Sequence, residues 1–131
     1  MNFDTDVSHY NQYKDMIGKT VYLSEDRCFY KADKYQYSYK PYSISHYTGL
    51  FPCVHKGKGK IPDVYSPIEI LPKGKPLKIL KAMNENASGF IWSHVIGKVY
   101  SKKLTKEVEF EYHLGFAHKP DPMPWNLEKP K

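Results

Sequence analysis

The most regular pattern in the chain is the alternation of apolar and polar residues along residues 106–116. One set contains Val108, Phe110, Tyr112, Leu114 and Phe116, and the other contains Glu107, Glu109, Glu111 and His113. Because successive side chains of a strand point to opposite faces, this pattern predicts a half-buried antiparallel strand. We interpret its acidic face as exposed to solvent, where the carboxylates can pair with lysines of neighbouring strands.

Shorter stretches with the same period of two predict further strands. Residues 20–32 are rich in β-branched and aromatic residues, as are residues 90–101, where Gly97 predicts a kink. Residues 84–89 contain Asn, Ser and Gly and predict the turn before the second of these strands. Few helix signals accompany them, so the chain is predicted to be all-β.

A tight connection is predicted in residues 67–82, where two apolar runs flank a Pro-Lys-Gly-Lys-Pro tip. Proline presets φ for a turn and Gly74 can adopt positive φ, so the runs are expected to be two strands. The residues expected to face the core are Ile68, Ile70, Leu77 and Ile79. Lys73 and Lys75 are expected to face water at the tip.

The two ends of the chain follow other patterns. Tyr10, Tyr13 and Ile17 have helical spacing after a capping residue at Asp6 or Ser8, which predicts one short helix. Four prolines among the last twelve residues predict an extended tail, with Trp125 packed on the barrel. We therefore divide the chain into an N-terminal segment, a single β-barrel domain and a C-terminal tail, which are residues 1–17, 18–116 and 117–131.

Length and composition agree with one globular domain. The chain has 131 residues, of which 40% are apolar, and no apolar run reaches the roughly 20 residues of a transmembrane helix. The start, "MNFDTDVSHY", does not have the pattern of a signal peptide. A native Met1 would make the protein cytoplasmic. A Met1 added before a mature chain would instead allow the periplasm or another part of the cell envelope.

Tyrosine is concentrated in one stretch, since six of the twelve tyrosines lie within residues 30–47. Pro41 interrupts any strand ladder there, which favours an edge or a long loop. These rings either cover the edge of the core or form an aromatic contact surface. The candidate partner-binding residues in this stretch are Tyr35, Tyr37, Tyr39, Tyr42 and Tyr47.

Lysines add a basic region to the middle of the chain. Residues 55–106 contain eleven lysines and three acids, whereas residues 107–131 contain three lysines and five acids. The candidate partner-binding lysines are Lys56, Lys58, Lys60, Lys73 and Lys75. The Lys-Gly loop that holds the first three does not have the spacing of a phosphate-binding loop. A positive field of this kind attracts nucleic acid, anionic lipid or an acidic protein surface.

The cysteine and histidine content predicts neither an active site nor a metal site. Cys28 and Cys53 are the only cysteines, and together with His55 they do not supply the four spaced ligands of structural zinc. His94 and His113 are interpreted as ordinary sheet residues. We expect no catalytic residues and no cofactor. In an oxidising compartment a Cys28–Cys53 disulfide would close the tyrosine-rich loop, and in a cytosol both thiols would be reduced.

Three quoted segments resemble bacterial SH3-like domains over roughly residues 18–116. They are "VYLSEDRCFYKA", "ILPKGKPLKILKA" and "FIWSHVIGKVYS", with a long Tyr/Pro loop after the first. The resemblance implies a small SH3-like antiparallel barrel with a ligand groove beside its long first loop. Family ligands are peptides, cell-wall fragments and other proteins. The loop between Tyr30 and Ile68 is longer than is usual in the family.

Two functional hypotheses follow. The first is a non-catalytic binding module of the bacterial envelope that recognises another protein or a cell-wall ligand, such as an immunity-type inhibitor or the soluble part of a lipoprotein. The second is a small basic nucleic-acid-binding barrel, with lysines on phosphates and tyrosines stacked on bases. Arg27 is the only arginine, although arginine makes most bidentate contacts to bases, so we rank the first hypothesis above the second.

Overall fold

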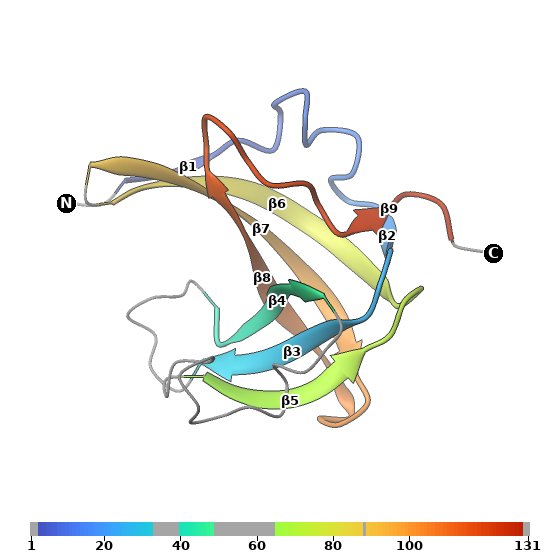
Figure 1. The fold of residues 1–131 in the computed structure, drawn as a ribbon. Helices are drawn as coiled ribbons and strands as arrows, with labels where there is room; N and C mark the ends of the chain where they lie inside the picture. The colour runs from blue at the N-terminus through green and yellow to red at the C-terminus, as the bar shows by residue number, and fades with distance from the viewer. Residues whose placement is uncertain (1–2, 33–39, 49–64, 88, 130–131) are drawn as a thin grey trace.

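The computed structural model describes residues 3–32, 40–48, 65–87 and 89–129, and these residues are all-β (Figure 1). This confirms the predicted fold class. The nine strands are β1 (Phe3–Asp6), β2 (Thr20–Leu23), β3 (Arg27–Ala32), β4 (Tyr42–Thr48), β5 (Tyr65–Leu71), β6 (Pro76–Ala87), β7 (Phe90–Ser101), β8 (Lys106–Phe116) and β9 (Trp125–Asn126). Within the described residues, no helix has the length and apolar character needed to cross a membrane.

The strands form one sheet that curls into a half-barrel (Figure 1). Their order is β5-β3-β4-β8-β7-β6-β2-β9, and β1 pairs with β6. The sheet is mixed rather than purely antiparallel, because β4 and β8 pair in parallel where Ser43 lies opposite Glu111. The long strands β6, β7 and β8 lie side by side, and β3, β4 and β5 lie in the lower half of Figure 1, where β7 and β8 also end.

The core lies on the apolar faces of these strands. Phe110 and Leu114 of β8 are fully buried, as are Leu77 and Ile79 of β6, which confirms the alternation expected for these residues. Phe116, expected on the same apolar face, is instead 38% exposed opposite Trp92, because the pairing of β7 with β8 shifts register between Ser93 and His94. Trp125 of β9 packs edge-on against the Tyr112 ring, 5.5 Å between centroids, so the C-terminal segment is fixed to the barrel as expected. Strands β1 and β9 belong to the same sheet as the central strands.

The tight connection between the two predicted strands does not form a hairpin. Strand β5 pairs with β3, whereas β6 pairs with β1, β2 and β7, so residues 72–75 carry the chain across the curl. Gly74 has φ 85° as expected. Its N–H donates to the Leu23 carbonyl over 2.8 Å, and the Leu23 N–H donates to the Lys75 carbonyl over 3.1 Å.

One residue of this region was assigned to the wrong face. Ile70 was expected in the core, but 50% of its surface is exposed, whereas Leu71 is fully buried. The pairing of β5 with β3 contains a register shift, and the alternation of β5 changes phase before the chain turns at Pro72. A period of two in the sequence cannot reveal such a shift.

The predicted N-terminal helix is wrong. Residues 7–18 form successive turns, and both ends bond to β6: the Val7 N–H donates to the Ala82 carbonyl, and the Gly18 N–H donates to the Ile79 carbonyl. Because the two acceptors, Ile79 and Ala82, are only three residues apart on β6, the segment between Val7 and Gly18 must fold back on itself. Tyr13 still packs into the core, where it is 2% exposed, so the apolar spacing was informative even though the helix was not.

Gly97 of β7 provides a sharp test of the packing. A Cβ at this position would lie 2.5 Å from the Lys78 carbonyl oxygen and 2.7 Å from Cζ of Phe110. We expect Gly97→Ala to lower the free energy of unfolding by about 1–3 kcal/mol or more, because a backbone carbonyl cannot move aside cheaply. The measurement is urea denaturation.

The matched control is Gly74→Asn, at a position with open space and positive φ that Asn tolerates. We expect it to change stability by only a few tenths of a kcal/mol. Equal unfolding midpoints for the two variants would contradict the packing described here.

Candidate functional site

Most of the residues that the sequence suggested for partner binding lie outside the described residues. These are Tyr35, Tyr37, Tyr39, Lys56, Lys58 and Lys60, together with Cys53 of the predicted disulfide. Cys28, on β3, is disulfide-bonded. Tyr47 belongs to β4. Tyr42 stacks on Phe29 with 5.6 Å between ring centroids and packs against the core, which agrees with a role at the core edge.

The two tip lysines have defined contacts. The Lys73 N–H donates to Oδ1 of Asp26 over 2.8 Å, which joins the tip to the bend between β2 and β3. The Lys75 ammonium lies 5.7 Å from the centre of the Tyr100 ring, within range of a cation–π contact. Lys73 is exposed, whereas Lys75 is half-buried. The tip is therefore a fixed part of the surface.

A cluster of two histidines and one glutamate was not anticipated as a site. His94 of β7 lies opposite His113 of β8, and Glu111 lies one pleat along the same face. Oε2 of Glu111 is 3.6 Å from Nδ1 of His94 and 3.4 Å from Nε2 of His113. Glu111 is fully buried and His94 is 3% exposed, so the prediction of a solvated acidic face is wrong at this position.

Neighbouring groups enclose the cluster. Nε2 of His94 lies 3.6 Å from Oε1 of Glu85 on β6. The backbone N–H of Lys40 donates to Oε1 of Glu111 over 3.3 Å, and the Lys40 ammonium pairs with Glu109 at 2.6 Å. Lys40, which precedes β4, thus lies over this face of β8. This non-local contact explains why the acidic row is not solvated throughout.

The surroundings shift the pKa values of groups in and around the cluster. Burial, and then the charge of His113, lower the pKa of His94 from 6.5 to about 3. Burial, and then the charge of Asp4, raise the pKa of Glu85. The Lys40 hydrogen bond holds the pKa of Glu109 below its usual value. At neutral pH His94 is therefore a neutral imidazole, which can act as a metal ligand or proton acceptor.

The cluster could have been found from the register of β7 and β8. A four-residue connection between residues 101 and 106 places Ser101 opposite Lys106 and, continuing along the pair, His94 opposite His113. The alternation already puts Glu111 on the same face as His113. Pairing the two predicted strands brings His94, His113 and Glu111 together, whereas neither strand taken alone does so.

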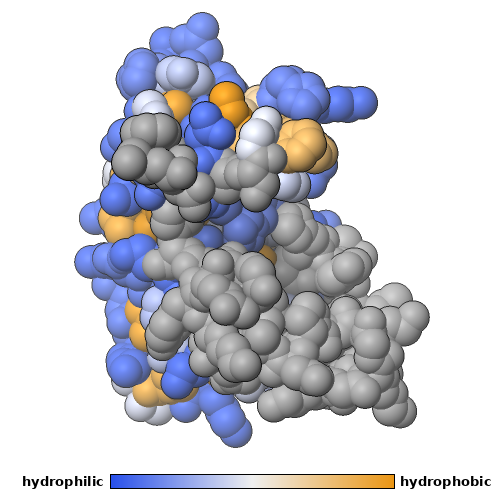
Figure 2. Space-filling view, turned by 90° about the vertical axis from the view of Figure 1, so that its left-hand side faces the viewer, coloured by the Kyte–Doolittle hydropathy of each residue, from blue (hydrophilic) through white to orange (hydrophobic). Residues whose placement is uncertain are grey.

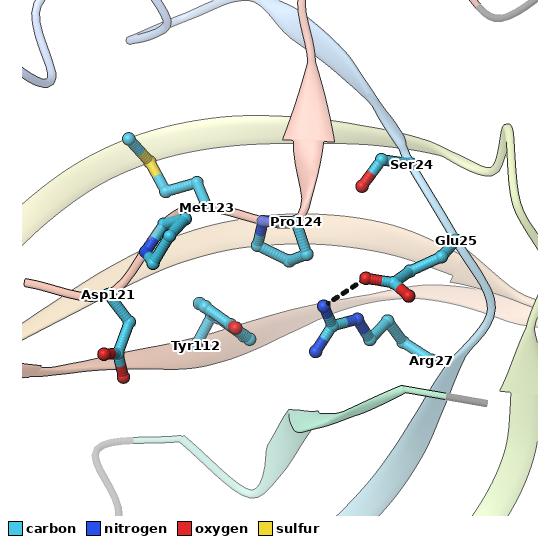
Figure 3. Close-up of a pocket in the computed structure, with 8 residues that line it drawn as sticks. Ser24, Glu25, Arg27, Tyr112, Asp121, Met123 and Pro124 are labelled. Atoms are coloured by element: carbon cyan, nitrogen blue, oxygen red, sulfur yellow. Dashed lines mark hydrogen bonds and ion pairs between the residues drawn. The ribbon is translucent and has the colours of Figure 1, made fainter. Parts of the chain in front are cut away.

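A separate cavity lies between the β2–β3 bend and the C-terminal segment (Figure 3). Its volume is about 450 Å³, and its lining residues are Ser24, Glu25, Arg27, Tyr112, Asp121, Pro122, Met123 and Pro124. Arg27 is 6% exposed and pairs with Glu25 at 2.8 Å, as the dashed line in Figure 3 marks. Burial raises the pKa of Tyr112. The cavity is lined by one cation, two carboxylates and an apolar wall. This mixture of charges does not favour either an anionic or a cationic ligand.

A patch of exposed aromatic rings lies where the β6–β7 hairpin meets the end of β8. We define the aromatic patch as Phe90, Trp92 and Phe116, which share one face. Trp92 and Phe116 stack with 4.5 Å between centroids, and Phe90 lies 5.6 Å from Phe116. Phe90 is 54% and Phe116 38% exposed. Figure 2, which faces this side of the molecule, shows hydrophobic surface among hydrophilic residues in its upper part.

No family model, curated protein or solved structure matches this chain.

The shifted histidine predicts a pH dependence of stability. The unfolded chain binds a proton at His94 near pH 6.5, whereas the folded chain resists it down to about pH 3. The contribution of neutral His94 to the stability of the fold is complete above the pKa that His94 has in the unfolded chain. It is lost as the pH falls below that value. We expect the free energy of unfolding, measured by urea denaturation in chelator-containing buffer, to fall between about pH 7 and pH 5 by up to about 1.4 kcal/mol per pH unit.

His94→Gln is the comparison, because it removes the titrating group. Its unfolding midpoint is expected to vary less over the same pH range. Glu85, Glu111 and His113 face His94 from β6 and β8. A wild-type midpoint that rises on acidification would mean that the two carboxylates outweigh burial.

Proposed function

We propose that this chain is a non-catalytic binding module that recognises another protein through the aromatic patch. The observation that carries this proposal is the exposure of Phe90 beside the stacked Trp92 and Phe116 rings. Exposed contiguous apolar surface on a folded domain commonly marks a contact site. Rings held against one another lose little conformational entropy on binding, and aromatic residues are enriched in such contacts.

The charge around the patch favours a particular partner surface. The Lys119 N–H bonds to the Phe116 carbonyl, which places Lys119 next to the patch, and the chain has a net charge of +6. A partner with apolar side chains surrounded by acidic groups would complement both features. Such a partner would bury the rings and place an acidic group against Lys119.

The sequence supports the same class of function. The resemblance to bacterial SH3-like domains implies peptides, cell-wall fragments or proteins as ligands, and we propose that the half-barrel is a distant variant of that fold. A disulfide at Cys28 favours an oxidising compartment, so we place the protein in the cell envelope. An immunity-type inhibitor and the soluble part of a lipoprotein are two forms that such a module takes.

Removal of the patch tests the proposal. We expect Phe90→Ser combined with Phe116→Ser to abolish capture of a stoichiometric protein partner, since the apolar contact is lost. The control is Tyr10→Ser, which removes another large exposed ring that is 41% exposed. Both variants are checked for unchanged circular dichroism before capture. A partner retained equally by the patch variant and the control would refute the aromatic patch as the binding surface.

Nucleic-acid binding is the alternative, and salt separates the two. Lysines that neutralise phosphates make affinity fall steeply as salt rises. We expect the full chain to bind labelled single-stranded DNA and RNA only weakly, because its cations are almost all lysine. The measurement is fluorescence anisotropy over a series of salt concentrations. Tight binding with a steep salt dependence would favour the nucleic-acid alternative.

A further inference from the structure

We propose that His94, Glu111 and His113 bind a divalent transition-metal ion such as Zn²⁺. The three side chains come from adjacent strands β7 and β8 and converge on one face of the sheet. Each offers one ligand atom, and these three atoms all lie within 4.8 Å of one another. The site is distinct from the aromatic patch, and the proposal does not depend on the proposed function.

The distances between the three groups fit a metal site. Oε2 of Glu111 is 3.4 Å from Nε2 of His113 and 3.6 Å from Nδ1 of His94. Bonds of about 2.0–2.1 Å to a tetrahedral ion would place ligand atoms about 3.4 Å apart. Two of the three separations are therefore close to those of a coordination shell.

The groups behind the ligands fit the same role. Glu85 lies 3.6 Å from Nε2 of His94, so a small shift of its side chain would let it accept the imidazole proton and leave Nδ1 for the ion. The Lys40 N–H bonds to Oε1 of Glu111, which directs Oε2 toward the histidines. Carboxylate partners on the second nitrogen of a ligating histidine, and hydrogen bonds to ligating carboxylates, are the usual support of metal sites.

Burial gives the ion an electrostatic role. Glu111 is fully buried and a buried carboxylate is costly, so a dication at its Oε2 would add compensating charge. The side chain of His113 is 32% exposed, which provides access from solvent. Two imidazoles and one carboxylate suit Zn²⁺ and other transition metals, whereas Ca²⁺ and Mg²⁺ prefer oxygen ligands. Three protein ligands would leave a position for water or an anionic group.

The test uses the full-length, tag-free chain after removal of metals with a chelator. Zn²⁺ is titrated in competition with a chromophoric chelator, and Co²⁺ binding is followed by its visible absorption. We expect one equivalent of either ion to bind. His113→Gln is expected to weaken binding at least tenfold, because it removes a ligand whose side chain is partly exposed. Glu111→Gln is expected to do the same, once its fold has been verified by circular dichroism.

The matched control is His118→Gln, at an exposed histidine outside the cluster, which should leave the affinity unchanged. Glu85→Gln keeps all three ligands and is expected to lower affinity by about 10–100-fold while leaving the Co²⁺ spectrum nearly unchanged. Absence of stoichiometric binding in the wild type would overturn the site. Binding that survives His113→Gln at wild-type strength would also overturn it.

Discussion

The curl of the sheet depends on one set of hydrogen bonds, where two connections of the chain meet. The bend after β2 and the tip before β6 both carry the chain across the open side of the half-barrel. Gly74 and Lys75 bond to Leu23, and the Lys73 N–H bonds to Asp26. Since β4 and β8 share a single pair of register partners, these contacts add to the common core in holding β3 and β5 against β6 and β2.

This closure also brings Lys40, just before β4, over the polar face of β8. The Lys40 backbone and ammonium reach Glu111 and Glu109, respectively. A glutamate that would face water in an open sheet thereby becomes fully buried. The candidate metal site is therefore a product of tertiary structure, although its ligands come from two strands that are neighbours in the sequence.

The sequence predicted what local alternation determines and missed what distant contacts determine. The bounds of β7 and β8 agree with the expected segments, because both stretches are rich in β-branched and aromatic residues and are bounded by turn residues. The N-terminal helix was wrong because Val7 and Gly18 are anchored to the same short part of β6. The burial of Glu111 required knowledge of what covers its face. The pairing of His94 with His113, in contrast, was available from the hairpin register.

The strand order also has a consequence for how the chain folds. Strands β6, β7 and β8 are a meander of adjacent hairpins, so their contacts are local and can form early. Closure of the sheet costs more conformational entropy, because Thr20 pairs with Lys78, and β4 with β8, over long separations in the sequence. We infer that the meander is the folding nucleus. The half of the sheet that contains β3 and β5 is then expected to assemble on it later, since it joins the meander through pairings between residues far apart in the sequence.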